Sequence, residues 1–298
     1  MSVIEELQTA VTSLAESAGP SIVGIGSHQR GSGVVVGDGH VLTNAHNLRG
    51  DEVTVTFADG RRTRGTVAGV DVDGDLAVVS VDTAGAKPLE WGAGDELVVG
   101  SAVFGAAATS GGGTRLTFGL VSAVARAFRG PGGRRIAGSV EHTAPLAPGS
   151  SGGAILDLAG RLVGINTNRI GEGFYLALPA DAALRARIDA LGRGESAERP
   201  RLGVAVAPSH VARRLRRSVG LPERDGLLVR GVEDDSLAAR AGIEAGDLIV
   251  EAAGRPITDA DELHDALSTT ALPFELKIVR GNEERTVSVG GTAVSGEA

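Results

Sequence analysis

The chain has 298 residues, 42% of them hydrophobic and 22% charged, which is typical of a soluble globular protein with two domains. Its formal net charge of −8 argues against a nucleic-acid partner, because binding to phosphates requires a basic surface. Cysteine is absent, and this excludes thiol catalysis, disulfide bonds and zinc sites with cysteine ligands.

Neither a membrane span nor an export signal is expected. The chain has no run of about 18 apolar residues, and its first residues, MSVIEEL, are acidic where a secretory signal is basic and then apolar. We therefore expect a cytoplasmic location. An extracytoplasmic location is the alternative, because exported bacterial proteins often lack disulfides as well.

The first part of the chain is predicted to be a helix followed by many short strands. Residues 3–17 place Val3, Ile4, Leu7, Val11 and Leu14 at helical spacing, and the helix should end before Gly19-Pro20. Short apolar runs then follow, interrupted by turn residues about every ten positions, which indicates a β-barrel or sandwich. The runs are 34–36, 53–57, 76–81 and 97–99, with a hairpin turn at 37–39 and predicted loops at 105–113 and 129–133.

A second, smaller unit is predicted after a break in composition. Residues 192–200, GRGESAERP, are small and charged and end in proline, which is typical of a linker. Residues 201–290 then mix helix and strand, and 291–298 are expected to form a tail. The predicted strands are LGVAV, DGLLVRGV, LIVEAAG and PFELKIVRG, and the predicted helix is 259–267.

Two details of the second unit are predicted from local patterns. Thr258 and Asp261 are spaced as a capping box for the helix at 259–267. The segment VARRLRRSVGL, 211–221, is predicted as a helix with its arginines in solvent and with Val211, Leu215 and Val219 facing inward.

The glycine-rich stretch APGSSGGAI, 147–155, is the strongest candidate for a functional loop. A Walker phosphate loop would require a lysine after the last glycine, and Ala154 stands there. The stretch fits the G-x-S-x-G elbow of α/β-hydrolases, but that elbow joins a buried strand to a helix. Here the preceding segment, EHTAPLAPG, contains two prolines and cannot be a central strand. The following segment, AILDLAGRLVGIN, is predicted as strand, turn and strand, without a helix. Both interpretations therefore fail.

A nucleophilic serine of the chymotrypsin type needs a histidine and then an aspartate earlier in the chain. His46 ends the segment VLTNAH after a predicted strand, and Asp75 opens DLAVVSV at the start of another. Taken singly, each has a simpler explanation, since most histidines are surface or packed residues and an aspartate at a strand start is usually a turn residue. Their order and spacing together favour catalysis.

These segments together resemble a known family. GSGVVV…HVLTNAH, DGDLAVVSV and PGSSGGAI…GRLVGINT are similar to the HtrA (DegP-like) family of trypsin-fold serine proteases. LGVAV and SLAARAGIEAGDLIVEAAGRPI resemble the PDZ domain that this family carries. The resemblance covers nearly the whole chain and implies a mainly β fold. A chymotrypsin-like double β-barrel protease domain would span 1–191, and a smaller α+β PDZ domain would span 201–290.

The resemblance also implies roles for individual residues. His46 would be the general base, Asp75 the carboxylate that orients it, and Ser151, which directly precedes Gly-Gly, the nucleophile. The backbone N–H groups of Gly149 and Ser151 would form the oxyanion hole. No cofactor or metal is implied. The sequence departs from the usual family pattern at Asn47, Thr143, Ser150 and Ala154, which affects loop geometry but removes no catalytic group.

The implied substrates are polypeptides. The segment 143–148 has no acidic residue, so we expect cleavage next to apolar side chains rather than next to lysine or arginine. The expected substrates are unfolded or misfolded chains, and the expected role is protein quality control. The PDZ domain would bind peptide C-termini. Its expected contacts are the backbone of Leu202, Gly203 and Val204 and an apolar pocket lined by Leu263 and Leu267; the alternative for both helix residues is simple core packing.

Two alternatives stay open at this point. Proteases of this family usually trimerise through aromatic residues in the N-terminal segment, but the first aromatic residue here is Phe57, so a homotrimer and a monomer are both possible. The rival function is a catalytically inert, peptide-binding or holdase-like scaffold.

Overall fold

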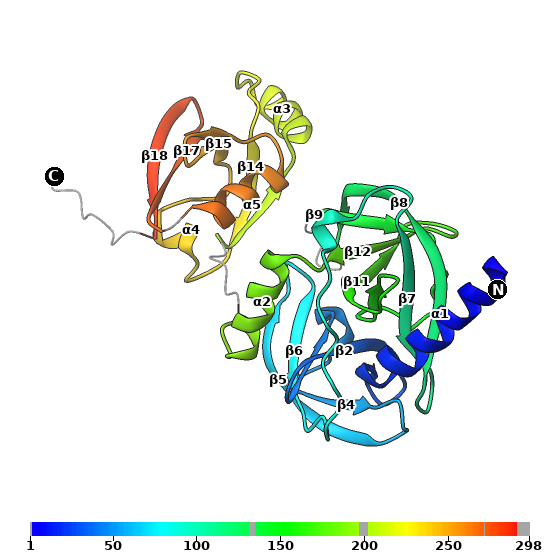
Figure 1. Cartoon of the computed structure of the whole chain (residues 1–298). Coiled ribbons are helices and arrows are strands. Elements are labelled where there is room, and N and C mark those ends of the chain that lie inside the picture. Colours follow the sequence, from blue (N-terminus) through cyan, green and yellow to red (C-terminus); the bar gives the residue numbers. More distant parts are fainter. Residues whose placement is uncertain (1, 131–134, 197–201, 271, 291–298) are drawn as a thin grey trace. The chain divides into compact units, whose positions relative to one another are not determined.

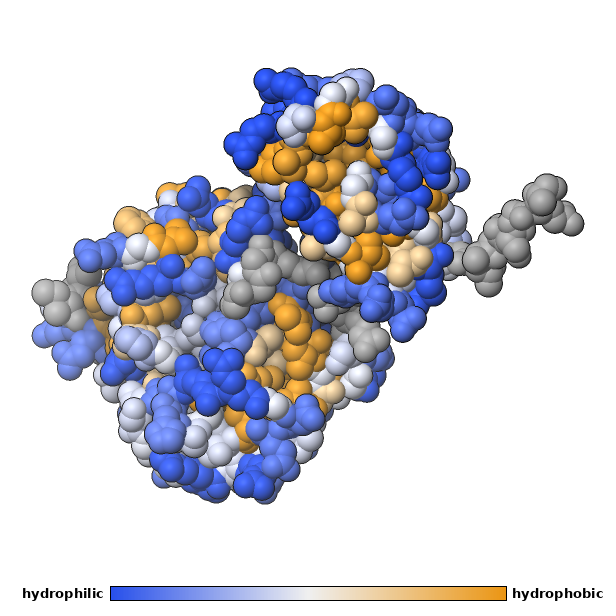
Figure 2. Space-filling view, turned by 180° about the vertical axis from the view of Figure 1, so that it is seen from behind, coloured by the Kyte–Doolittle hydropathy of each residue, from blue (hydrophilic) through white to orange (hydrophobic). Residues whose placement is uncertain are grey.

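The computed structural model describes residues 2–130, 135–196, 202–270 and 272–290. The chain divides into two compact units, Met1–Ala197 and Glu198–Ala298, which are described separately (Figure 1). Hydrophilic side chains cover most of the face seen in Figure 2, with apolar patches on each unit. No helix among the described residues has the length and apolar character needed to cross a membrane.

The first unit consists of two closed six-stranded barrels, as expected for a double β-barrel. The first barrel has the order β1-β2-β3-β6-β5-β4 and the second the order β10-β11-β12-β9-β8-β7. The strands are β1 (Ile22–Ile25), β2 (Gly31–Gly37), β3 (His40–Thr43), β4 (Glu52–Thr56), β5 (Arg62–Asp71), β6 (Leu76–Ser80), β7 (Ala102–Ala108), β8 (Thr114–Arg129), β9 (Arg135–His142), β10 (Ala154–Leu156), β11 (Leu162–Arg169) and β12 (Tyr175–Pro179).

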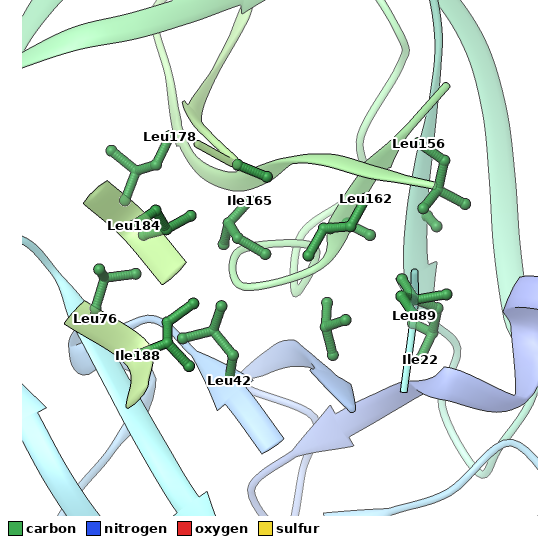
Figure 3. Packing of buried hydrophobic residues seen from close by; sticks show 14 of the residues in the cluster. Ile22, Leu42, Leu76, Leu89, Leu156, Leu162, Ile165, Leu178, Leu184 and Ile188 are labelled. Atoms are coloured by element: carbon green, nitrogen blue, oxygen red, sulfur yellow. The ribbon is translucent and has the colours of Figure 1, made fainter. Parts of the chain in front are cut away.

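A shared hydrophobic core fixes the two barrels against each other. Side chains from both barrels and from helix α2 (Ala182–Gly192) form one buried cluster (Figure 3). The first barrel supplies Ile22, Leu42 and Leu76, the second Leu156, Leu162 and Ile165, and α2 supplies Leu184 and Ile188. Burial of side chains of this size is the main source of stability, at about 1.5–3 kcal/mol each. The loops that leave the barrels near this junction are therefore held in fixed relative positions.

Helix α1 (Val3–Ala18) forms as predicted and begins with a capping box between Ser2 and Glu5. Among the apolar side chains of this helix that the structure describes, Leu14 is buried and Val11 packs against the shared core, whereas Leu7 is exposed.

One strand prediction and one loop prediction in the first unit are wrong. Residues 97–99 are not a strand but follow the short 3₁₀ helix η3 (Gly94–Glu96), and Val98 and Val99 are exposed. The expected loop at 105–113 belongs to strand β7 up to Ala108 and turns only after it. Gly105 is closely packed in that strand, because a Cβ there would lie 2.9 Å from the Leu146 side chain and 3.0 Å from the Thr117 hydroxyl.

The expected linker at 192–200 is shortened at its start by contacts with the first unit. Gly192 is the last residue of α2, and the Ser196 hydroxyl accepts a hydrogen bond from the Val70 N–H of β5 at 3.3 Å. The rest of the expected linker, 197–200, and the expected tail, 291–298, lie outside the described residues.

The second unit is a sheet with strand order β13-β14-β15-β17-β18, with β16 paired to β15, and with helices beside it, which is the predicted α+β class. Its elements are β13 (Val204–Ala207), α3 (Ser209–Ser218), β14 (Leu227–Val232), α4 (Leu237–Arg240), β15 (Leu248–Ala252), β16 (Arg255–Pro256), α5 (Ala260–Thr269), β17 (Phe274–Arg280) and β18 (Glu283–Val289).

Both local predictions for this unit need correction. The capping box of α5 is formed by Asp259 and Glu262, one residue later than predicted. In the arginine-rich segment Val219 is 71% exposed, while Arg216 is buried and donates hydrogen bonds to the carbonyl groups of Pro222 and Gly281. Those two acceptors compensate for the burial of the guanidinium.

Candidate active site

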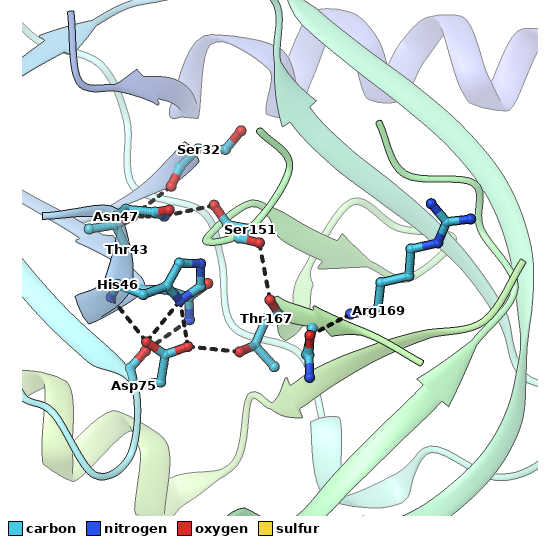
Figure 4. Close-up of polar contacts among 10 residues, drawn as sticks. Ser32, Thr43, His46, Asn47, Asp75, Ser151, Thr167 and Arg169 are labelled. Atoms are coloured by element: carbon cyan, nitrogen blue, oxygen red, sulfur yellow. Dashed lines mark hydrogen bonds and ion pairs between the residues drawn. The ribbon is translucent and has the colours of Figure 1, made fainter. Parts of the chain in front are cut away.

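His46 and Asp75 form a direct pair in the first barrel (Figure 4). His46 lies in the 3₁₀ helix η2 (Ala45–Asn47) after β3, and Asp75 ends the turn between β5 and β6 with a positive φ of 55°. Nδ1 of His46 lies 2.8 Å from Oδ2 and 3.0 Å from Oδ1 of Asp75. Since a carboxylate accepts this hydrogen bond, the proton of a neutral imidazole is on Nδ1, and Nε2 is left as a base.

Further hydrogen bonds fix the Asp75 carboxylate, which is buried. The backbone N–H of His46 donates to Oδ1 at 3.1 Å, and the Thr167 hydroxyl donates to Oδ2 at 3.0 Å. The side-chain amide of Asn44 donates to the Asp75 carbonyl at 2.8 Å. Groups from both barrels therefore hold this side chain in one orientation.

Ser151 lies in the tight turn between β9 and β10, where it approaches the first barrel. Its carbonyl accepts hydrogen bonds from the Ser32 N–H at 2.8 Å and from the Asn47 side-chain amide at 3.0 Å. The next residue, Gly152, has a φ of +84°, and a Cβ there would lie 2.2 Å from the Ser32 carbonyl oxygen. Only glycine fits this close approach.

The structure brings the three predicted catalytic side chains to one cavity. His46, Asp75 and Ser151 line a cavity of about 380 Å³ together with Thr167 and Arg169. The hydroxyl of Ser151 donates to the Thr167 carbonyl at 3.0 Å, and among the described residues this is its hydrogen-bond partner in place of His46.

The turn also leaves two backbone donors free beside Ser151. Gly149 has a φ of +84°, and its carbonyl accepts from the Ser32 hydroxyl at 2.8 Å. Within the described ranges, the N–H groups of Gly149 and Ser151 donate to no protein acceptor. Unpaired N–H groups beside a hydroxyl group are the kind of donor that an oxyanion hole uses.

A second cavity of about 170 Å³ adjoins Ser151, with Leu146, Ala147, Pro148 and Tyr175 among its lining residues. The described residues that line it include no acidic side chain. Behind it, Nε2 of the buried His142 lies 3.0 Å from Oδ1 of Asn166, and the His142 ring stacks on Tyr175. Burial lowers the pKa of His142 to about 4, so this side of the cavity is neutral near pH 7.

The comparisons with known proteins agree with this geometry. The family model of a trypsin-like peptidase domain matches residues 31–165, and that of a PDZ domain matches 228–280. The putative serine protease HhoA of Synechocystis is 34% identical over 278 residues, which cover 87% of this chain and 70% of HhoA. The chain belongs to the HtrA (DegP-like) family of trypsin-fold serine proteases with a C-terminal PDZ domain.

Other relatives are similar over most of this chain. The probable periplasmic serine endoprotease DegP-like of Halomonas elongata is 32% identical over 268 residues, covering 87% of this chain and 55% of that protein. The chain thus spans little more than half the length of this DegP-like relative. A structure of the HtrA-type protease AlgW with decapeptide has a TM-score of 0.74 and 26% identity, covering 94% of this chain and 97% of AlgW.

In the PDZ domain of this HtrA-family chain, the predicted residues fall into two groups. The side chains of Leu202, Leu263 and Leu267 all belong to the buried core cluster, which favours core packing for the two helix residues. Gly203 has a φ of +75°, and a Cβ there would lie 2.3 Å from the Ser236 Cβ. Val204, which is half-buried, begins β13. The backbone at Gly203 is therefore closely constrained.

Several polar contacts of the site were not predicted from the sequence. In the sequence Thr167 is only the last residue of GRLVGINT and Asn47 only a departure from the family pattern, yet the Thr167 hydroxyl bonds to Asp75 and the Asn47 side chain to the Ser151 carbonyl. Ser32 shows no signal in the sequence beyond its place in GSGVVV. A polar residue ending a buried apolar run, as Thr167 does, is the signal that would have found it. Within the described residues no cluster of three or more potential ligand side chains could hold a metal ion.

Proposed function

We propose that this chain is an active serine endopeptidase that cleaves unfolded or misfolded polypeptides through an acyl-enzyme, and that its PDZ domain binds peptide C-termini. The observation that carries the proposal is the common cavity of Ser151, His46 and Asp75, with His46 already oriented by the carboxylate. A serine hydroxyl needs such a base to become a nucleophile at neutral pH.

The proposed reaction follows from these positions. The Ser151 hydroxyl turns from the Thr167 carbonyl to His46 Nε2, which takes its proton as Oγ attacks the peptide carbonyl carbon. Asp75 stabilises the imidazolium that forms. The N–H groups of Gly149 and Ser151 receive the developing oxyanion, and loss of one such donor typically costs about 3–4 kcal/mol. His46 then protonates the leaving amine, and water releases the acyl group by the same steps in reverse.

The cavity beside Ser151 supports apolar side chains on the residue before the scissile bond. Its lining includes the apolar side chains of Leu146, Ala147, Pro148 and Tyr175, and its one charged residue among those described is Arg169, so it has no carboxylate that could pair with lysine or arginine. Profiling of cleavage sites on a denatured protein should show cuts after small or medium apolar residues. Predominant cuts after lysine or arginine would contradict this part of the proposal.

For the PDZ domain we propose that backbone N–H groups of Leu202, Gly203 and Val204 hold the peptide carboxylate while the peptide pairs with the sheet edge. The relative AlgW has been solved with a decapeptide, which supports a peptide ligand. Gly203→Ala should abolish binding of a peptide with a free C-terminus, because its Cβ would meet Ser236. Gly231→Ala is the matched control, since a Cβ there meets no atom within 4 Å.

Casein cleavage tests the peptidase proposal directly. The purified chain should degrade a fluorescent casein, Ser151→Ala should not, and Ser150→Ala, which alters the neighbouring serine, should retain cleavage. Undiminished cleavage by Ser151→Ala would refute the assigned nucleophile. The inert scaffold is favoured only by the present orientation of the Ser151 hydroxyl, and peptide binding without any casein cleavage would support it.

A further inference from the structure

Strand β11 has an open edge next to the candidate nucleophile. On one side it pairs with β12 as far as Arg169 opposite Tyr175, and on the other it pairs with β10 only as far as Ile165. Backbone bonds to the serine turn continue to Asn166. From Thr167 to Arg169 this second side has no strand partner among the described residues, and the Ser151 hydroxyl contacts its first residue at 3.0 Å.

The backbone of Arg169 is available for pairing on this open side. Its N–H donates to the Asn168 side-chain oxygen at 2.9 Å, while the next N–H, of Ile170, donates to Phe174 at 3.1 Å across the turn toward β12. Since successive N–H groups of a strand alternate in direction, the Arg169 N–H faces away from β12. The carbonyl of an incoming strand would replace the Asn168 side chain there.

This edge sets the register of an extended peptide. Suppose that a peptide pairs antiparallel with residues 167–169, and that the residue just before its scissile bond lies beside Thr167 and Ser151. The residue three positions before the scissile bond then lies opposite Arg169. Directly opposed residues in an antiparallel pair project their side chains to the same face. The Arg169 side chain is therefore the neighbour of that third residue.

The charge of Arg169 is uncompensated. Its Nε donates to the Gly171 carbonyl at 2.7 Å, which holds the guanidinium and leaves both terminal nitrogens for a ligand. No carboxylate of the described residues lies within ion-pair distance, in contrast to Arg126, Arg161 and Arg187 of the same unit. Arg169 lines both cavities at Ser151, and in Figure 4 Ser151 lies between it and the His46–Asp75 pair.

The cavity offers Arg169 no free acidic partner. Among the described residues that line it, the only carboxylate is that of Asp75, which is buried and bonded to His46. The chain as a whole carries a formal charge of −8, so the positive charge of Arg169 beside Ser151 is a local feature and not a consequence of composition. A guanidinium with two free nitrogens recognises a carboxylate in a bidentate manner.

We propose that Arg169 selects substrates with an acidic side chain at the third residue before the scissile bond. This proposal rests on the proposed peptidase function, because the third position is defined relative to the bond that Ser151 attacks. Arg169 is then a specificity-determining residue, and acidic peptides are the preferred substrate class. The apolar preference applies only to the residue just before the scissile bond, which enters the cavity at Leu146 and Tyr175.

Binding to a variant that cannot cleave tests this proposal apart from catalysis. We would use Ser151→Ala and three peptides that differ only in glutamate, glutamine or lysine at the third position, each amidated at its C-terminus so that the PDZ domain has no carboxylate to bind. The glutamate peptide should bind about fivefold more tightly than the glutamine peptide at low ionic strength, and the lysine peptide most weakly. High salt should reduce the difference.

Variants of Arg169 then identify the source of the preference. Arg169→Gln in the same background should equalise the three affinities, and Arg169→Glu should favour lysine. Arg62→Gln removes an exposed arginine of β5 that lines neither cavity, and it should keep the preference for glutamate. In the active chain the same order should hold for kcat/KM.

Equal affinities in the Ser151→Ala background, or a glutamate preference that survives Arg169→Gln, would overturn the proposal. Failure of the peptidase function has a different signature, because the active chain would then cleave none of the three peptides while the binding measurement would still report on Arg169.

Discussion

The hydroxyl of Thr167, on the second barrel, donates a hydrogen bond to Oδ2 of Asp75, on the first barrel, at 3.0 Å. The two barrels thus meet at the carboxylate that orients His46. The carbonyl of Thr167 in turn accepts the Ser151 hydroxyl, so one residue contacts both ends of the proposed triad.

Removal of the Thr167 hydroxyl should therefore slow catalysis. Thr167→Val preserves the side-chain volume but deletes a hydrogen bond to a charged group, and we expect kcat/KM to fall about tenfold. Thr167→Ser retains the donor and should keep most of the activity. Peptide hydrolysis by the three proteins checks this, and an unchanged kcat/KM for Thr167→Val would mean that Asp75 does not need this contact.

Gly152 is predicted to be intolerant of any side chain. Gly152→Ala would combine a positive φ with a Cβ 2.2 Å from the Ser32 carbonyl oxygen, so the serine turn could not stay against the first barrel. Gly171→Ala has the same kind of φ, +120°, but no atom within 4 Å of its Cβ. We expect Gly171→Ala to cost about 1–2 kcal/mol in unfolding free energy and Gly152→Ala clearly more.

Urea unfolding of both glycine variants, monitored for the first unit, gives the comparison. Equal losses of stability would show that the backbone angle alone, and not the close approach to Ser32, determines the effect.

The lowered pKa of His142 should make the stability of the first unit depend on pH. Burial lowers its pKa from 6.5 to about 4, so the unfolded chain binds this proton more readily than the folded one. Stability should therefore fall as the pH drops below about 6.5, with a loss of about 3 kcal/mol once the pH is below about 4.

Matched variants separate this histidine from the other acid-sensitive groups. His142→Gln keeps a donor for Asn166 but cannot titrate, so it should flatten the decline between pH 6.5 and 4. His28→Gln changes an exposed histidine and should leave the decline as it is. Unfolding by urea at several pH values measures both slopes, and identical slopes for His142→Gln and the parent chain would contradict the assignment.

One ion pair of the PDZ domain, between Arg280 and Asp247, should contribute more to the stability of that domain than an exposed ion pair does. The Arg280 guanidinium contacts both oxygens of the buried Asp247 at 2.8 Å. Arg280→Gln leaves that carboxylate buried without its cation, and we expect a loss of about 3 kcal/mol. Arg285→Gln breaks an exposed pair with Glu283 and should cost less than about 1 kcal/mol. Thermal unfolding of the PDZ domain checks both values.

Acid should weaken the same contact. Hydrogen bonds from Arg280 offset the desolvation of Asp247 and hold its pKa below the ordinary value. A lowered carboxyl pKa contributes stability above the unfolded-state value, and this stability is lost as the pH falls toward the folded-state value. The pH dependence of PDZ unfolding below about pH 4 should therefore be smaller in Arg280→Gln than in the parent chain.

The sequence predicted the parts of the fold that depend on local pattern. The hairpin at 37–39 and four strands of the PDZ domain, β13, β14, β15 and β17, follow from apolar runs and turn residues, whereas β16 and β18 were not predicted. The run 97–99 could not be distinguished from a strand by pattern alone, because nothing local shows that Val98 and Val99 remain in solvent. Gly105 was predicted in a loop because glycine is typical of turns, although it lies within β7 and packs closely against Leu146.

Long-range contacts account for what the sequence could not predict in the site. His46, Asp75 and Ser151 stand in recognisable motifs, but Ser32, Asn47 and Thr167 acquire their partners only when the two barrels close on each other. Arg216 shows the same limit in the PDZ domain, since its acceptor on Gly281 is 65 residues away and its burial could not be seen in a run of arginines.

The most direct test of the central claim is labelling with a fluorophosphonate, followed by mass spectrometry of the modified peptide. The account predicts one adduct, on Ser151, that disappears in Ser151→Ala and is strongly reduced in His46→Ala because the base is lost. An unmodified Ser151 in the folded chain, or an adduct that forms equally well in His46→Ala, would contradict it.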